Sequence, residues 1–214
     1  MSNLKTITQF KSKLVGGGAR PNLFEVNINK FPFVGDWDNE TFQFLCKAAA
    51  LPASNVASVE IPFRGRTLKV AGDRTFDNWT ITVINDEDFR LRSAFELWMN
   101  GISKLSDASG ATEPNSYMGN ATVHQLGRGY NKGRSSEENS GAGDGSAGIV
   151  GIKPLRTYYF DGIFPTNVSA IDLSYDSGDT IEEYTVDFQV QYWVAGKSST
   201  SGAATDATTL TIEW

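Results

Sequence analysis

Apolar and polar residues alternate in eight segments spread along this 214-residue chain, and this period of two constrains its fold more than any other feature. Successive side chains of a strand point to opposite faces of a sheet, so alternation predicts strands with one buried face. The alternating sets are Phe24/Val26/Ile28, Phe42/Phe44/Cys46, Trp79/Ile81/Val83, Ala121/Val123, Tyr158/Phe160, Ile171/Leu173, Tyr184/Val186/Phe188/Val190/Tyr192 and, near the end of the chain, Leu210/Ile212/Trp214. We therefore expect a mainly β domain in which one face of a sheet meets water.

One segment has the period of a helix instead. Its apolar residues recur every three or four positions and form a stripe, namely Leu91, Ala94, Phe95, Trp98 and Ile102. Asn85 is the predicted N-cap, and the acidic residues 86–88 would favour the positive end of the helix dipole. The pattern predicts a single helix over residues 86–102, packed against a sheet.

The charge balance argues against a protein that grips nucleic acid. The chain carries 19 Lys and Arg against 25 Asp and Glu, for a net charge of −6. Phosphate binding relies on basic side chains that displace counterions, so any contact with DNA should be loose. No run approaches the ~20 apolar residues of a membrane span and no signal peptide is recognisable, so we expect synthesis in the cytoplasm. Cys46 is the only cysteine and is expected to be a small buried hydrophobe.

The motifs that suggest chemistry have simpler explanations. Residues 143–148 match a dinucleotide fingerprint, but they lie in a linker of small residues and not between a strand and a helix. His124 is the only histidine, which removes most zinc sites and any His-based triad, and it is expected to be a partly exposed strand residue. The acidic residues 86–88 could hold calcium, although helix capping explains them more simply. We predict no catalytic, cofactor or metal site and no small-molecule substrate.

The segment VAGDRTFDNW, residues 70–79, is rich in residues that form turns and ion pairs. It predicts a sharp turn at Gly72 that leads into a strand. Arg74 is expected to pair with a carboxylate of its own subunit or of a neighbour. A catalytic alternative would need a pocket, for which the sequence gives no sign.

Five strings in this order resemble the tail tube protein of contractile-tailed phages. They are ARPNLFEV at 19–26, FLCKAAALPA at 44–53, VAGDRTFDNWTITVIND at 70–86, GIFPTNV at 162–168 and DLSYDSGDTIEEYTVDFQVQYW at 172–193. The chain departs from the family at 35–39, in the insertion 130–151, beyond Val194, and at Phe164, where relatives often carry Trp. These departures affect the outer surface and the ends of the subunit.

The resemblance implies two antiparallel sheets that form a small barrel or sandwich with one flanking helix. It further implies a hexameric ring whose inner wall is a continuous β-barrel. On this basis we divide the chain into an N-terminal arm (1–18), a tail tube domain (19–194) with a flexible insertion at about 130–151, and a C-terminal extension (195–214).

The function implied by the resemblance is structural and not enzymatic. Rings stack into a tube inside the contractile sheath, the tube penetrates the host envelope, and double-stranded DNA passes through it without specific binding. The implied partners are further copies of the chain, the sheath, baseplate, tail terminator and tape measure proteins, and the implied location is the virion. A tube subunit of a phage-derived injection device is the nearest alternative. A carbohydrate-binding β-sandwich or a β-rich hydrolase would instead be a monomer with a ligand pocket.

Two sets of candidate residues follow from this hypothesis. Closure of a ring joins opposite edges of neighbouring subunits, so strand edges and the loop 49–58 are candidate contact elements. The candidate interface residues are Pro21, Asn22, Leu51, Pro52, Asn55, Asp73, Arg74 and Asp77. A bore that lets DNA pass should be polar or acidic, and its candidate lining residues are Asp187, Gln189 and Gln191.

Overall fold

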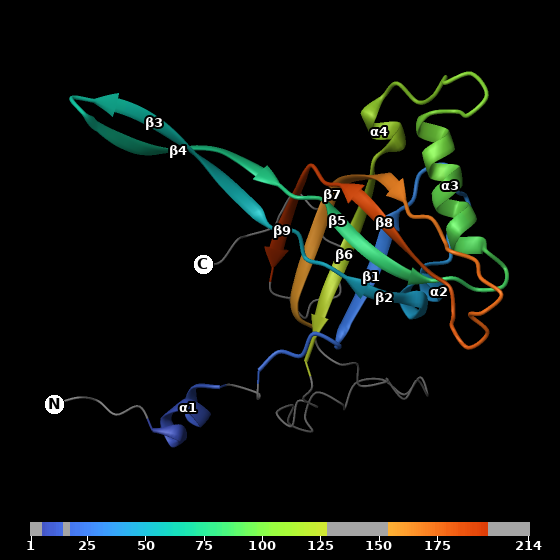
Figure 1. The fold of residues 1–214 in the computed structure, drawn as a ribbon, viewed down its shortest axis with the longest axis horizontal. Coiled ribbons are helices and arrows are strands. Elements are labelled where there is room, and N and C mark those ends of the chain that lie inside the picture. Colours follow the sequence, from blue (N-terminus) through green and yellow to red (C-terminus); the bar gives the residue numbers. More distant parts are fainter. Residues whose placement is uncertain (1–5, 15–17, 128–153, 197–214) are drawn as a thin grey trace, which may run out of the picture. The chain divides into compact units, whose positions relative to one another are not determined.

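The computed structural model of the protein describes residues 6–14, 18–127 and 154–196, which are mainly β (Figure 1). The chain divides into two compact units. One consists of residues 26–122 and 158–194, and the other of residues 1–25, 123–157 and 195–214. The predicted insertion 130–151, the motif at 143–148 and the last predicted strand lie outside the described residues.

The described strands form two sheets. The larger sheet has seven strands in the order β1-β6-β7-β8-β5-β2, and β9 pairs with β7. Its strands are β1 (Phe24–Lys30), β2 (Cys46–Ala49), β5 (Trp79–Ile84), β6 (Gly119–Leu126), β7 (Pro154–Val168), β8 (Glu183–Gln189) and β9 (Tyr192–Gly196). The ladders β2–β5, β5–β8 and β7–β8 are antiparallel. The mainly β prediction is confirmed, and β1 and β2 stand at the two ends of the strand order.

The second sheet is a two-stranded antiparallel ribbon of β3 (Ser54–Phe63) and β4 (Arg66–Phe76). Its residues are exposed or half-buried. The ribbon therefore does not cover the larger sheet as the second layer of a sandwich would.

The core is built on the pair β5–β8, where the predicted alternation is confirmed. Trp79, Ile81 and Val83 are fully buried, and their neighbours in β5 are half-buried. Phe188 of β8 lies opposite Trp79 in the ladder, so large apolar side chains meet on one face of the sheet. The Trp79 ring also stacks on that of Phe160, with 4.7 Å between ring centroids.

Helix α3 (Arg90–Ile102) packs its apolar stripe on this face, as predicted. Leu91, Ala94, Phe95 and Trp98 are buried. The rings of Phe95 and Trp98 each lie 6.0 Å from the ring of Phe188, between centroids. The Trp98 indole N–H donates a hydrogen bond of 2.8 Å to the Tyr117 carbonyl, which satisfies its only polar group.

The predicted start of this helix is wrong. The helix begins at Arg90, and its N-cap is Phe89 in the left-handed conformation (φ 53°), with no side-chain cap. Residues 86–88 form a preceding turn that is closed by a hydrogen bond from the Phe89 N–H to the Asp86 carbonyl. Asn85 caps nothing, because its backbone N–H and its side-chain amide both donate to Glu182, each at 2.9 Å.

The strand predicted from Phe42, Phe44 and Cys46 is also wrong. Residues Asn39–Leu45 form helix α2, and β2 begins only at Cys46. Asp38 is the N-cap, and its carboxylate accepts hydrogen bonds from the hydroxyl (2.6 Å) and the backbone N–H (3.0 Å) of Thr41, which lower the pKa of Asp38. Phe42 is buried while Phe44 is 79 % exposed. The predicted burial of Cys46 is confirmed.

Two further strand predictions fail near the end of the domain. The long strand expected through Tyr192 ends at Gln189, bends at Gln191 and resumes as β9, which pairs with β7. Ile171 and Leu173 lie in the loop between β7 and β8, where no strand forms. That loop contains turns around Tyr175–Asp176 and Gly178–Asp179, and both sequences favour turns.

Besides α2 and α3, two short helices occur in the described residues, so the expectation of one helix was too low. They are α1 (Ile7–Lys13), which lies within the predicted N-terminal arm, and α4 (Pro114–Tyr117). The side chain of Thr6 caps α1, and Gln9 completes a capping box. None of the helices that the structure describes is long and apolar enough to cross a membrane.

Candidate functional site

The ribbon β3–β4 is the most unusual surface of the described chain. Its ladder runs from the pair Ser54–Phe76 to the pair Phe63–Arg66. Arg64 (φ 47°) and Gly65 (φ 82°) form the two-residue turn at its tip, and positive φ at both positions matches the right-handed twist of a hairpin. Glycine occupies this conformation without strain, so the Arg-Gly sequence fixes where the strands reverse.

The ribbon has one apolar and one polar face. Residues directly opposite in an antiparallel ladder share a face. The apolar face consists of Val59, Ile61, Phe63, Leu68 and Val70. On the other face the Glu60 carboxylate lies 3.2 Å from the Lys69 ammonium nitrogen.

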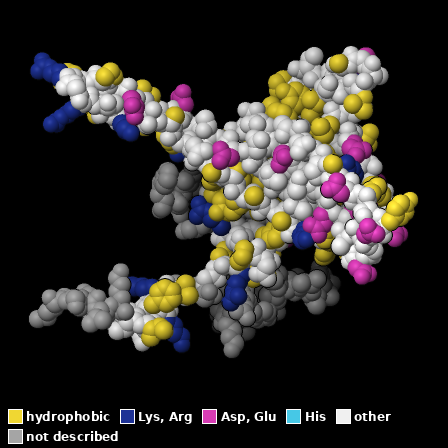
Figure 2. Space-filling view, viewed as in Figure 1, with side chains coloured by type: hydrophobic (Ala, Val, Ile, Leu, Met, Phe, Trp, Pro, Cys, Tyr) yellow, Lys and Arg dark blue, Asp and Glu magenta, His cyan; other side chains and the backbone are white. Residues whose placement is uncertain are grey.

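The apolar face is open to solvent in the single subunit. Its side chains are between 43 % (Val70) and 67 % (Phe63) exposed. Hydrophobic side chains run along the ribbon, and basic side chains gather at its tip (Figure 2). A two-stranded hairpin is marginal in water on its own, and a large exposed apolar surface marks an interaction site. The apolar face of the ribbon is therefore a candidate interaction site.

A β-bulge bends this ribbon near its middle. The register shifts between Val56 and Ser58, so Gly72 and Asp73 together face Ala57. Gly72 lies inside β4, which corrects the turn predicted there; the reversal occurs at Arg64–Gly65. Bulges increase local twist and redirect a strand, so this one sets the direction of the outer half of the ribbon.

Several predicted interface residues meet at the base of the ribbon. The Asn55 amide donates to the Asp77 carboxylate at 2.9 Å, and the Asp77 N–H donates to the Ala53 carbonyl at 3.1 Å. These bonds tie the start of β3 to the residue that follows β4. Asp73 and Arg74 are exposed nearby in β4. Within the described residues Arg74 makes no ion pair, so its pairing with a carboxylate of its own subunit or of a neighbour stays a prediction.

The remaining interface candidates lie elsewhere. Pro21 and Asn22 occupy an exposed turn before β1, closed by a hydrogen bond from the Leu23 N–H to the Arg20 carbonyl. In the link between β2 and β3, Leu51 is 44 % exposed while Pro52 is buried. Pro52 thus packs in the interior, and only Leu51 of this pair is accessible to a neighbouring subunit.

Two of the three candidate bore residues share the polar face of β8. The Asp187 carboxylate accepts hydrogen bonds from the Thr80 hydroxyl (2.6 Å) and from the Asn167 amide (3.1 Å). Gln189 is half-buried and lies opposite Phe164 of β7. Gln191 is exposed in the bend after β8, so the structure does not align it with the other two in one strand.

This polar face suits contact with water and not with phosphate. Neither β5 nor β8 contains Lys or Arg. Thr80 lies opposite Asp187, and Thr82 opposite Thr185, which gives a surface of hydroxyl groups and one carboxylate. At the end of this polar face, Glu183 of β8 forms an ion pair with Lys47 of β2.

His124 is half-buried in β6, as expected for a strand histidine. Its Nδ1 forms a hydrogen bond of 2.9 Å with the Thr157 hydroxyl.

The apolar face of the ribbon was missed by the sequence reasoning. The signal was present, because Val59, Ile61 and Phe63 alternate with polar residues and Pro62 before Arg64-Gly65, and Leu68 and Val70 alternate after it. Two alternating runs separated by two residues that include Gly predict a hairpin.

Comparisons with known proteins agree on one family. A family model described as phage tail tube protein matches residues 19–196. The tail tube protein gp19 of Enterobacteria phage T4 is 34 % identical over 178 residues, which cover 83 % of this chain and 92 % of the relative. The gp19 protein of Enterobacteria phage T6 is 33 % identical over the same shares.

Solved structures share the fold. A chain in the sheath-tube complex of an extracellular contractile injection system, PVC, in its extended state aligns with a TM-score of 0.54. The identity is 12 %, and the alignment covers 90 % of this chain and 99 % of the other. A chain of the tube terminating cap of the anti-feeding prophage aligns with a TM-score of 0.54 and 14 % identity over 85 % of this chain and 92 % of the other.

Proposed function

Because the chain belongs to the phage tail tube protein family, we propose that its copies close into hexameric rings that stack into a hollow tube. Double-stranded DNA passes through this tube, and the subunit has a structural and not an enzymatic role. The single observation that carries the assembly is the ribbon β3–β4, whose apolar face is exposed in one copy and calls for a second copy to cover it.

The edges of the large sheet supply a second reason for assembly. β1 and β2 stand at the two ends of its strand order, and each has one side without a partner strand among the residues that the structure describes. A head-to-tail contact that joins one edge to the opposite edge of the next copy leaves no free edge once the ring has closed. Ring closure would produce the continuous inner β-barrel.

The polar face of β5 and β8 is our candidate for the wall of the bore. Asp187 and Gln189 lie on that face, and neither strand carries a basic residue. Because every basic residue would be repeated in each copy of each ring, even one per subunit would offer a passing duplex many phosphate contacts. A wall of hydroxyl, amide and carboxylate groups avoids this, and the neighbouring Lys47 is paired with Glu183.

The partners we propose are those of a contractile tail. Similar folds occur in a sheath-tube complex and in a tube terminating cap, which supports a sheath around this tube and a terminator at its end. A baseplate protein and a tape measure protein complete the set, and the tube is part of the virion after synthesis in the host cytoplasm. The 34 % identity to a phage protein favours a phage tail over an injection device, and the neighbouring genes would separate the two.

Assembly can be tested with a matched pair of ribbon variants. Ile61→Asp places a charge on the apolar face, and Ser58→Asp places the same charge on the polar face of the same strand. We expect wild-type protein and Ser58→Asp to form rings or tubes in electron micrographs, while Ile61→Asp stays monomeric by sedimentation velocity. Circular dichroism checks that both variants fold. Wild-type protein that remains monomeric at every concentration would overturn the proposal.

A further inference from the structure

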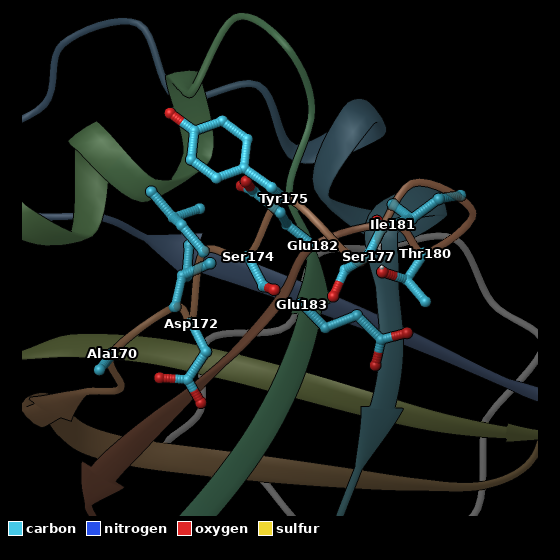
Figure 3. Close-up of a pocket in the computed structure, with 11 residues that line it drawn as sticks. Ala170, Asp172, Ser174, Tyr175, Ser177, Thr180, Ile181, Glu182 and Glu183 are labelled. Carbon is cyan, nitrogen blue, oxygen red and sulfur yellow. Dashed lines mark hydrogen bonds between the residues drawn. The ribbon is translucent and has the colours of Figure 1, made fainter.

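Besides the apolar face of the ribbon, the loop between β7 and β8, residues 169–182, exposes large hydrophobic side chains to solvent. Leu173 is 80 % exposed, Ile181 is 71 % exposed, and Tyr175 is fully exposed. Together with the first residue of β8, the loop surrounds an open hollow of about 660 Å³. In Figure 3 the side chains of Asp172 and Glu183 lie on either side of the hydroxyl groups of Ser174 and Ser177.

The loop that forms this hollow is strongly acidic, and of its three aspartates Asp172 lines the hollow itself. Residues 170–183 contain Asp172, Asp176, Asp179, Glu182 and Glu183, and no Lys or Arg. Glu182 bonds to Asn85 and Glu183 to Lys47. The three aspartate carboxylates make no hydrogen bond or ion pair with any described residue. They are available to a partner that brings positive charge.

The loop is anchored at both ends and free between them. The Ser169 N–H donates to the Thr185 carbonyl at 2.9 Å, and Arg92 donates to the Ser169 carbonyl at 3.2 Å. At the other end the Asn85 N–H donates to the Glu182 carbonyl. Residues 170–181 make only local hydrogen bonds, so a ligand can adjust them without disturbing the sheet.

The tip of the ribbon has the complementary chemistry. Phe63 is 67 % exposed, Arg64 lies over its ring with 5.3 Å from the guanidinium carbon to the ring centroid, and Arg66 is its ladder partner. Neither arginine forms an ion pair within the described residues. An exposed aromatic ring with one guanidinium group over it, and a second arginine opposite it in the ladder, matches a loop that combines apolar side chains with unpaired aspartates.

One chain cannot bring these two surfaces together. Both belong to the unit of residues 26–122 and 158–194, and Figure 1 places the ribbon tip and the β7–β8 loop at opposite ends of that unit. Figure 2 shows the same separation, with basic side chains at the ribbon tip and acidic side chains gathered at the far side. A contact between opposite ends of identical copies is heterologous, so it extends from copy to copy.

We infer that the β7–β8 loop is the receptor for the ribbon tip of a second copy, with Phe63 in the hollow and Arg64 and Arg66 on the aspartates. This inference rests on the proposed tube function and names the docking site of its ribbon. Because exposed ion pairs are screened by salt, the charged part of the contact weakens as ionic strength rises, while the Phe63 contact does not.

A charge swap tests this pairing. Arg64→Asp with Arg66→Glu reverses the tip, and Asp176→Lys with Asp179→Lys reverses the loop. We expect either double variant to raise the concentration needed for assembly by about tenfold or more, and the mixture of both chains, or all four changes in one chain, to restore it. Lys104→Glu and Glu40→Lys, which change charge elsewhere on the exposed surface, should assemble as wild type does.

Crosslinking gives a readout that does not depend on charge. Phe63→Cys in one chain and Ile181→Cys in a differently tagged chain should be joined by a short bismaleimide when mixed under assembly conditions, since Cys46 is buried. A Ser58→Cys chain in place of Phe63→Cys should not be joined. If wild-type protein assembles but the swaps have no effect and no crosslink forms, the receptor is wrong and the tube proposal stands. If wild-type protein never assembles, the tube proposal itself fails.

Discussion

Gly72 of β4 lies so close to Ala57 of β3 that a Cβ atom at position 72 would be 3.1 Å from the Ala57 carbonyl oxygen. The same atom would lie 3.2 Å from Cγ2 of Val59. Such an approach is tighter than most Cβ contacts, so a side chain here would push β3 away, and it occurs at the bulge where the ribbon changes register. The direction of the outer ribbon therefore depends on this contact.

Gly72→Val should disturb assembly more than folding. The branched side chain would crowd the Ala57 carbonyl and Val59 of β3, so we expect the bulge to open and the ribbon tip to move. Because the ribbon contributes little to the core, we expect Tm to fall by less than about 4 °C while tube formation is largely lost. Differential scanning fluorimetry and electron microscopy measure the two effects. Gly65→Asn, which keeps a residue tolerant of positive φ at the turn, is the control and should assemble. Normal tubes from Gly72→Val would contradict the role of the bulge.

Gln189→Lys should convert the proposed bore into a DNA-binding surface. One basic residue per copy would repeat around each ring and along the tube, and binding through several phosphates is strongly salt-dependent. We expect duplex DNA to sediment with tubes of this variant at about 50 mM salt and to be released at about 200 mM. Gln189→Glu tubes are the matched control and should retain none. If the Gln189→Lys variant forms tubes that do not bind DNA at low salt, this face does not line the bore.

Cys46 should resist alkylation in the folded subunit. Burial raises the pKa of its thiol from 9.0 to about 12, so the reactive thiolate is roughly a thousandfold scarcer at neutral pH than for an ordinary cysteine. Intact-mass measurements with iodoacetamide at about pH 8 should show no adduct until denaturant is added. An added surface thiol, Ser58→Cys, should react at once. Equal labelling of both sites would mean that β2 opens readily.

The contact between Tyr192 and Asp161 should make stability depend on pH. The Tyr192 hydroxyl donates to the Asp161 carboxylate at 2.5 Å, and this bond raises the pKa of Tyr192. A phenol whose pKa is higher in the folded state stabilises the fold below its unfolded pKa of about 10, and that contribution is lost as the pH rises further. Because Tyr192 is 46 % exposed, we expect Tyr192→Phe to lower Tm by only about 1–2 °C at pH 8.

The difference in Tm between wild type and Tyr192→Phe should shrink as the pH rises above 10. A thermal melting series across this range measures it, and Tyr159→Phe serves as a control that should show no such trend. A constant difference would indicate that the hydroxyl acts through packing and not through the hydrogen bond.

Strands buried on one face were predictable from sequence. Trp79, Ile81 and Val83 alternate with threonines, and burial of one face leaves such a run no other arrangement. The stripe of α3 was equally clear, because Leu91, Ala94, Phe95 and Trp98 are all buried and the rings of Phe95 and Trp98 meet Phe188 of the sheet. For this strand and this helix, the side-chain packing and the period of the sequence favour the same secondary structure.

The wrong predictions of secondary structure arise where only a few residues show the periodic pattern, or where tertiary contacts determine the local structure. Phe42 and Phe44 also fit a helix that buries one ring and exposes the other. The N-cap formed by Asp38 favours this helix over a strand. The break after Gln189 follows from the pairing of β9 with β7, which lies far away in sequence. Among the candidate interface residues, the Asn55–Asp77 hydrogen bond could not be foreseen because it depends on the ribbon that brings both ends together.

The exposed apolar face of the ribbon also bears on the fate of subunits that find no neighbour. Val59, Ile61 and Phe63 form a short segment of high β propensity, which is the type of sequence that stacks into cross-β fibres. Pro62 and the Glu60–Lys69 pair sit within the same stretch, and such residues act as gatekeepers against that stacking. Subunits present in excess over their neighbours would thus rely on Pro62 and this ion pair to keep the exposed segment from stacking.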